Sequence, residues 1–361
     1  MKKFEIPEIP HELVAGAKLL QNDVWNLRDP ELKKPAVTLT WDDPEYESDG
    51  LIIEPKRMVE DPEYDLEVQL RIIRRRIEML EAGSTGPQSF PTLNLVHFGT
   101  GAIATAFGST AVLQKGIQPH FDPAIHTPEE ALAMEMPDLY RGGMLGTILD
   151  RIEFYNEATQ GKIPITISDN AGPWSIASSV WHYEDILEGM ITCPEAVHHL
   201  LGLMTRAIIE VNVIQMEAAH NSWGRPGDTL GWTWFPRGTG IGDDVMVTVS
   251  TPMWKEFFLP YNEILSTHYG GIIYHCCMKH DWHLKAMSET RGFMGFDAAP
   301  EYNSLDKIEE ALTGKGVWNR AIPDLDLIRR YRGKFGLFLA AHGRTKSEAV
   351  EKAKRLPDAI R

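Results

Sequence analysis

The densest group of chemically versatile side chains lies in the segment YHCCMKHDWH, residues 274–283. An apolar run, GIIYHCC, ends there in His275, Cys276 and Cys277. Imidazole and thiolate together select zinc, and a spacing of two on a strand turns His275 and Cys277 to one side while Cys276 points to the other. The spacing predicts a zinc site on His275 and Cys277. A buried cysteine pair beside a core histidine is the alternative.

A zinc ion needs further ligands from elsewhere in the chain. Two ligands from one strand suit a catalytic zinc with an open coordination position better than a closed structural site. His342 in FGLFLAAHGRT ends the last apolar run of the chain, so we expect it to reach the same edge of a sheet. Cys193 is a poorer candidate, since it precedes a helical pattern and suits a packing role.

Two carboxylates follow a glycine-rich segment, RGTGIGDD, and are candidates for acid–base chemistry. Asp243 and Asp244 could donate or accept a proton, or could orient a metal-binding side chain through a hydrogen bond. Hydrogen-bonded turn residues are the alternative. Neither this segment nor HFGTGAIATAFG matches a phosphate-binding loop or a dinucleotide fingerprint, so we do not expect nucleotide binding.

Aromatic residues crowd the predicted loops and suggest a flat-walled substrate pocket. If those loops share one mouth, the pocket suits a planar ring or a macrocycle. Core packing is the alternative use of each. The predicted substrate-binding residues are Trp174, Trp181, Tyr183, Trp232, Trp234 and Asn319.

Short β-branched or apolar runs that alternate with helical patterns must position these residues. Eight such runs favour a closed (β/α)8 barrel over an open sheet, with chemistry at the carboxyl ends of the strands. We expect a helical extension over residues 1–30 and one barrel over 31–361. The predicted strands cover residues 35–41, 91–98, 164–169, 229–235, 271–277, 292–297, 316–322 and 335–342.

Composition and charge restrict the partners. The 361 residues carry 51 acidic against 36 basic side chains, a formal net charge of −15, which argues against nucleic acid or an anionic membrane as partner. Three cysteines, two of them adjacent, cannot build a disulfide framework, so we expect a reducing cytoplasmic location. The N-terminus lacks the apolar run of a signal peptide, and glycines interrupt the uncharged stretch 94–113 too often for a membrane span.

Several segments together resemble the uroporphyrinogen decarboxylase superfamily. They are residues 169–204, with its Pro-Trp-Ser segment, residues 243–265, with PMWKEFFLPY, the strand GIIYHCC, and the late GKGVWNRAIPD and FLAAHG. The resemblance covers roughly residues 160–355 in order, with a weaker similarity at 97–108. It implies a (β/α)8 barrel with its site at the carboxyl ends of the strands.

The superfamily holds two main chemistries, and departures from the family patterns favour one of them. The decarboxylase branch carries an Arg-rich motif near its N-terminus, which this chain lacks. It also carries an Asp before the first Gly-rich loop and a Tyr after the Pro-Trp segment, whereas this chain has Gly99 near the position of the Asp and Ser179 at the position of the Tyr. The methyltransferase branch carries a His-x-Cys that His275 and Cys277 match. Its late Cys is absent, and His342 lies near that place.

The resemblance therefore implies a zinc-dependent methyltransferase. It would move a methyl group between a small substrate and a corrinoid (cobalamin) carried by a partner protein. The substrate would be a methoxylated aromatic undergoing O-demethylation, another methyl donor, or a thiol acceptor. A porphyrinogen-type decarboxylase and a non-catalytic corrinoid- or tetrapyrrole-binding barrel are the alternatives. A homodimer is left open.

Overall fold

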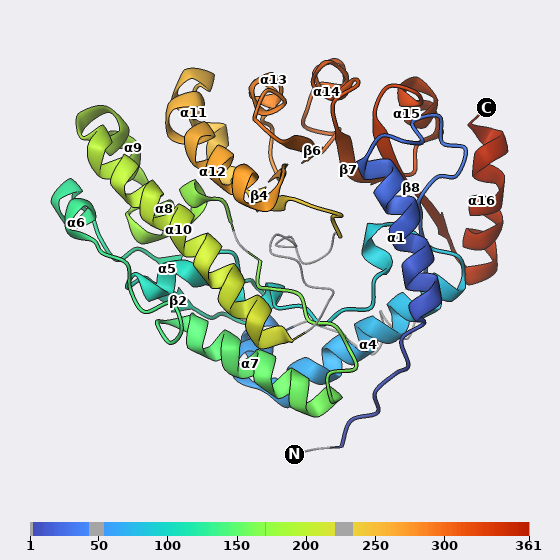
Figure 1. Cartoon of the computed structure of the whole chain (residues 1–361), viewed down its shortest axis with the longest axis horizontal. Helices are drawn as coiled ribbons and strands as arrows, with labels where there is room; N and C mark the ends of the chain where they lie inside the picture. Colours follow the sequence, from blue (N-terminus) through green and yellow to red (C-terminus); the bar gives the residue numbers. More distant parts are fainter. Residues whose placement is uncertain (1–2, 43–53, 170, 221–233, 361) are drawn as a thin grey trace.

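The computed structural model describes residues 3–42, 54–169, 171–220 and 234–360. Its main sheet is parallel, in the order β1-β8-β7-β6-β5-β4. Parallel strands need a crossover after each strand, and helices supply it here, so a ring of helices surrounds the strands (Figure 1). The strands of this sheet are β1 (Val37–Trp41), β4 (Thr239–Gly242), β5 (Ile272–Cys276), β6 (Phe293–Ala298), β7 (Val317–Ile322) and β8 (Gly336–Gly343).

Two further segments continue the sheet beyond β4 through single parallel bridges. Leu93 pairs with Ile165, and Ala171 pairs with Gly242 at the end of β4. These segments stand where the sequence predicts the second and third strands of the barrel. Six strands and two bridged segments thus follow one another in the order of a (β/α)8 fold, which confirms the predicted fold class.

The helices alternate with the strands as the sequence predicts. They are α1 (His11–Trp25), α3 (Pro55–Glu60), α4 (Pro62–Glu81), α5 (Ala102–Ala106), α6 (Pro128–Ala133), α7 (Met144–Thr159), α8 (Pro173–Val180), α9 (Tyr183–Thr192), α10 (Pro194–Ala219), α11 (Thr251–Phe257), α12 (Leu259–Tyr269), α13 (Leu284–Met287), α14 (Leu305–Leu312), α15 (Leu325–Tyr331) and α16 (Lys346–Ala359). Short 3-10 turns are η1 (Pro87–Ser89), η2 (Val96–Phe98) and η3 (Asp244–Thr248), and β2 (Thr110–Val112) pairs antiparallel with β3 (His120–Asp122).

The strand predicted at 229–235 is misplaced. Residues 229–233 lie outside the described part, and Trp234 and Phe235 precede β4, which runs over Thr239–Gly242 inside the glycine-rich segment. Glycine has low β propensity, so a pattern search passes over TGIG. A Cβ on Gly242 would meet the His275 ring at 3.7 Å, an ordinary contact distance, so this glycine lies directly beside His275.

Helix α1 packs under the amino-terminal ends of the strands. Trp25 is buried there against Phe235 and Phe338, with ring centroids 5.4 and 5.6 Å apart. These residues join Val24, Ala36, Ile273, Met294 and Val317 in a small apolar cluster of their own. The helix therefore closes one end of the barrel and leaves chemistry to the other. The domain boundary near residue 30 stays a prediction.

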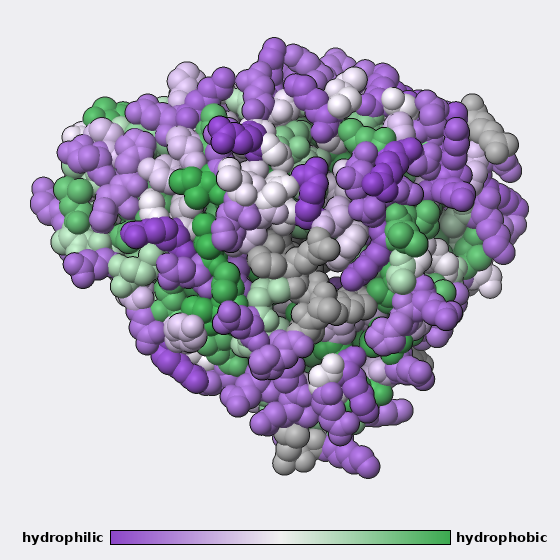
Figure 2. Space-filling view, in the orientation of Figure 1, coloured by the Kyte–Doolittle hydropathy of each residue, from purple (hydrophilic) through white to green (hydrophobic). Residues whose placement is uncertain are grey.

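Helix α10 is long and apolar enough to cross a membrane by length and composition. Of its most apolar window, 56% is buried inside the protein. The helix belongs to the main hydrophobic core through Val197, Leu200 and Leu201. It is therefore a core helix of this fold. The face of the molecule seen in Figure 2 is mainly hydrophilic.

Candidate metal and active site

His275 in β5 and Cys277, the residue directly after β5, lie on the inner side of the sheet. Ile273, two residues earlier, joins the apolar cluster inside the barrel, while Ile272, Tyr274 and Cys276 pack outward into the main core. Nε2 of His275 lies 3.2 Å from Sγ of Cys277. The structure therefore confirms the alternation predicted from the spacing, including the burial of Cys276.

Asp297 at the end of β6 orients the imidazole of His275. The sheet register sets the two residues opposite each other, and Oδ2 of Asp297 lies 3.0 Å from Nδ1 of His275. Burial lowers the pKa of His275, but the hydrogen bond and charge of Asp297 raise it, with a net rise above its ordinary value. A carboxylate on Nδ1 leaves Nε2 to face the thiol, as in carboxylate–histidine–zinc arrangements.

The thiol of Cys277 is exposed at the rim, next to Asp244. Oδ1 of Asp244 accepts a hydrogen bond from the Cys277 amide at 2.8 Å. Burial raises the pKa of the Cys277 thiol, and the Asp244 carboxylate raises it further. The thiol thus stays protonated near neutral pH until a cation replaces its proton.

A polar cavity of ≈ 400 Å³ opens beside Asp297. Arg320 on β7 donates through Nε to Oδ1 of Asp297 at 2.8 Å. Asn319 is buried in the wall, and in the described residues its Nδ2 has no hydrogen-bond partner. The remaining lining is mainly polar or small: Thr38, Thr40, Pro87, Gln88, Ala321 and Ala340. Asn319, one of the predicted substrate-binding residues, thus lines this cavity.

The two predicted acid–base residues point in different directions. Asp243 is buried and accepts a hydrogen bond from the Ser175 amide at 3.0 Å, in the first turn of α8. Burial raises the pKa of Asp243 to about 7. A side chain on Gly172 would collide with its Oδ2, so this glycine admits the carboxylate. Asp243 therefore caps a helix, and Asp244 is the member of the pair beside Cys277.

Asp169 is a third carboxylate near His275, at the end of the bridged segment 164–169. Burial raises the pKa of Asp169 to about 7, and the charge of His275 opposes that rise. It is therefore a group that can hold or release a proton at neutral pH.

His342 lies at the same rim but apart from His275 and Cys277. Its Nδ1 is 3.1 Å from Oγ1 of Thr40, and its Nε2 is 3.2 Å from Oδ1 of Asp42. Within the described residues no third His, Cys, Asp or Glu ligand atom lies within 4.8 Å of both members of the pair. The reason is the strand order: β6 and β7 separate β8 from β5.

The structure does not gather the predicted aromatic residues into one pocket. Trp174 stacks on Phe258 in the core at 5.1 Å, and Trp181 is fully buried. Tyr183 donates to Thr248 in η3 at 2.8 Å. Trp232 lies outside the described residues.

Trp234 lies at the opposite end of the barrel. It contacts Phe90 at 6.1 Å, and Lys18 of α1 lies over its ring. The error follows from the misplaced fourth strand, because a tryptophan before β4 cannot reach the carboxyl ends.

The two later histidines of the motif serve the loop after β5. Nδ1 of His280 contacts the Met278 carbonyl at 2.8 Å. His283 contacts Thr251 and the Met246 carbonyl, and burial lowers its pKa to about 4. Both histidines are fully buried, which suits packing rather than ligation.

Sequence reasoning missed Asp297, Asp169 and Arg320. The first two close predicted strands and Arg320 lies in another, so a search restricted to strand ends would have found the carboxylates. It also missed a cluster of His126, His182 and Asp185 on the helical side of the molecule.

Comparisons with known proteins agree with this fold. The family model for uroporphyrinogen decarboxylase (URO-D) matches residues 95–222. A solved methyltransferase from Methanosarcina mazei superposes with a TM-score of 0.60, covering 95% of this chain and 98% of that chain at 16% sequence identity. A search of curated proteins gives no match. The strand with His275 and Cys277 lies outside the range that the family model matches.

Proposed function

Because the family model for uroporphyrinogen decarboxylase matches residues 95–222, we propose that the chain is a member of that superfamily and a zinc-dependent methyltransferase. It would move a methyl group between a small substrate and a corrinoid protein. The likeness in fold to a methyltransferase supports the reaction class. The His-x-Cys strand supports the metal.

One observation carries the proposal: His275 stands between a carboxylate and a thiol. In tetrahedral zinc, bonds of about 2.0–2.3 Å separate neighbouring N and S ligand atoms by about 3.5 Å. Nε2 of His275 and Sγ of Cys277 are 3.2 Å apart, so a small adjustment admits the ion. Asp297 already holds the imidazole in the required orientation.

His342 is the proposed third ligand. Its side chain is 57% exposed, so a change of rotamer meets little packing resistance, although its contacts with Thr40 and Asp42 would have to break. Asp244, which contacts the Cys277 amide, is the competing donor on the near side of the site.

When bound, zinc would supply a Lewis acid that lowers the pKa of a substrate thiol or polarises a methyl ether oxygen. The protein must then manage one proton. Transfer from a methyl ether to cobalt breaks the C–O bond, and the oxygen leaves with the electron pair and takes up a proton. Transfer to a thiol releases a proton. Asp169 can serve either direction, because its pKa is about 7.

The cavity composition refines the substrate class. Its wall carries Asn319, Arg320 and threonine hydroxyls rather than stacked aromatic rings. We therefore favour a small polar methyl donor or thiol over a methoxylated aromatic. The corrinoid would belong to a partner protein that docks at the barrel mouth. The three free cysteines support a cytoplasmic location.

The proposal is tested with free cobalamin in place of the partner. The zinc-loaded protein is mixed with methylcobalamin and a thiol, and separately with cob(I)alamin and methyl ethers, thioethers or amines. Absorption spectra of the cobalamin report methyl transfer. We expect turnover with one of these classes and its loss in His275→Ala.

The control replaces the exposed His268, which lies away from the cavity, by alanine. It should keep the wild-type rate. His275→Ala is also assayed after a chelator has removed its zinc. Full activity of this zinc-free variant would refute the proposed site.

A further inference from the structure

A second group of metal-binding side chains lies on the helical side of the molecule. His126 precedes α6, His182 precedes α9, and Asp185 lies in the first turn of α9. One ligand atom from each lies within 4.8 Å of the other two. Helices α6 and α9 are at the left of Figure 1, away from β6, β7 and β8.

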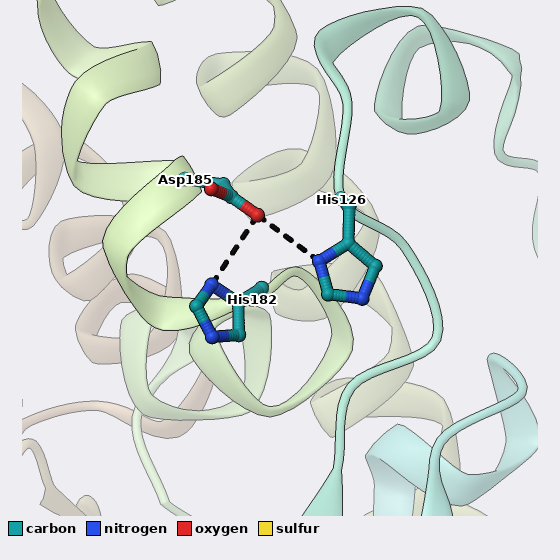
Figure 3. A group of neighbouring side chains, drawn as sticks. All are labelled: His126, His182 and Asp185. Carbon is teal, nitrogen blue, oxygen red and sulfur yellow. Dashed lines mark hydrogen bonds and ion pairs between the residues drawn. The ribbon is translucent and has the colours of Figure 1, made fainter.

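Both imidazoles approach one carboxylate oxygen through the same ring atom. Oδ2 of Asp185 lies 3.1 Å from Nδ1 of His126 and 3.2 Å from Nδ1 of His182 (Figure 3). The rings are 5.2 Å apart at 30°. Three donor atoms from two chain segments thus converge on one point.

The backbone fixes the two histidines side by side. Ile125 and Trp181 form a parallel bridge, and the amide of His182 donates to the Ile125 carbonyl at 3.0 Å. Because the bridge sets the register, the residues that follow its two members are neighbours. The backbone therefore places the two histidines next to each other.

A capping box holds the segment that carries His126. Thr127 and Glu130 exchange side-chain to backbone hydrogen bonds at the start of α6. Glu130 also accepts the amide of His126 at 2.9 Å. Ligands on such anchored segments lose little conformational entropy when they bind an ion.

The hydrogen bonding around His182 is incomplete. Its Nδ1 is buried, and in the described residues it has no hydrogen-bond partner, although Oδ2 of Asp185 is 3.2 Å away. The distance is short, but the two groups are not aligned. A shared cation between the three donor atoms would satisfy this nitrogen.

The spacing agrees with a tetrahedral ion. Bonds of about 2.0–2.1 Å to nitrogen and oxygen place neighbouring ligands about 3.3 Å apart. The two His–Asp distances of 3.1 and 3.2 Å come close to that value, and the ligand atoms of the two imidazoles lie within 4.8 Å of each other. Two imidazoles and one carboxylate are donors that suit Zn²⁺.

We propose that His126, His182 and Asp185 form a second zinc site, separate from the barrel mouth, which ties the segment before α6 to the start of α9. The donors are part-exposed, so the fourth position is open to water. Such a site binds more weakly than a closed one.

The test uses Cys277→Ser protein, which removes the proposed ion at the mouth. Zn²⁺ is titrated against a chromophoric chelator at pH 7.5, without a His tag. We expect one zinc per chain in this background. Adding His182→Ala should weaken binding at least about 10-fold, the low end of what even indirect ligand changes cost.

The chain offers a matched control in His120, another exposed histidine within ion-pair distance of a carboxylate, Asp122 at 3.3 Å. His120→Ala in the same background should bind zinc as tightly as its parent. Zinc should also raise the thermal midpoint of the parent and of the His120→Ala protein, but not of the His182→Ala protein.

Equal zinc affinity with and without His182 would overturn the proposal. So would an equal loss in the His120 variant, which would indicate adventitious binding to surface histidines. Neither result depends on methyl transfer, so the test is independent of the proposed function.

Discussion

Asp297 holds two groups at once. Its Oδ2 faces His275, and its Oδ1 accepts from Arg320. The guanidinium keeps the carboxylate in place while the carboxylate keeps the imidazole in place. The chemistry of the pair on β5 thus depends on residues from the next two strands.

Replacing Asp297 by asparagine should weaken zinc binding by about 10–100-fold, because the amide no longer fixes the tautomer that leaves Nε2 to the metal. Competition with a chelator measures the change. Asp281→Asn is the control, since this carboxylate also follows β5 but contacts Ser304 and Lys307. Unaltered zinc affinity in the Asp297 variant would mean that another group orients His275.

The sequence is informative about residues where a strand alternates. The spacing of two predicts that His275 and Cys277 face inward and that Cys276 packs outward. The role of Asp297 could not be predicted in the same way, because its contact with His275 depends on the register between β5 and β6. The cluster of His126, His182 and Asp185 depends on a single bridge between distant segments.

At the scale of elements, His283 connects the loop after β5 to the helices beside it. Its ring contacts Thr251 and the Met246 carbonyl and stacks on Trp254 at 5.9 Å. The neutral imidazole fits this site, and burial lowers its pKa from 6.5 to about 4.

This histidine should make stability depend on pH. Its pKa is lower in the folded chain than in the unfolded one, so its contribution is complete above the unfolded value of 6.5 and is lost as the pH falls toward about 4. Between pH 7 and 5 the wild type should lose about 1–2 kcal/mol more than His283→Asn, measured by urea unfolding. The exposed His268→Asn serves as the control. Parallel pH profiles of wild type and His283→Asn would contradict this account.

Elements with strong patterns are well predicted, and those with weak patterns are not. The runs that became β1, β5, β6, β7 and β8 are apolar and sit between turn residues. The strand β4 has the sequence TGIG, and its glycines carry no strand signal. Because this strand was misplaced, the position of Trp234 was also predicted wrongly.

At the scale of the molecule, a buried ionic network joins α4 to α7. The guanidinium of Arg151 pairs with Asp65, which also accepts from the Tyr155 hydroxyl at 2.6 Å and lies 3.1 Å from Nε2 of His97. Arg151 further donates to two carbonyls, those of Met58 and Val59. The network holds the helices of the first half around the barrel.

Arg151→Met should destabilise the fold by about 3–5 kcal/mol, since it leaves the Asp65 carboxylate buried without its cation. Urea unfolding at neutral pH gives the change in free energy. Arg141→Met is the matched control, because its pair with Asp150 is exposed on both sides and should leave stability nearly unaltered. A loss no larger than that of the control would show that the network tolerates an unpaired carboxylate.

The barrel as a whole was predictable from the number and order of the apolar runs. Its substrate pocket was not, because the aromatic residues entered the core and polar residues line the cavity instead. Side chains of similar composition can pack inward or line a mouth, and only the positions of the strands decide between the two.

The most direct test of the zinc site measures how much tightly bound zinc each of four proteins retains. All four are purified without a His tag and carry His182→Ala. They are the parent, Cys277→Ser, His342→Ala and Cys193→Ser. We predict about one zinc per chain in the parent and in Cys193→Ser, and none in Cys277→Ser. His342→Ala should also lose the ion, because His342 is the proposed third ligand. One zinc per folded chain in Cys277→Ser, or none in the parent after loading, would contradict the account.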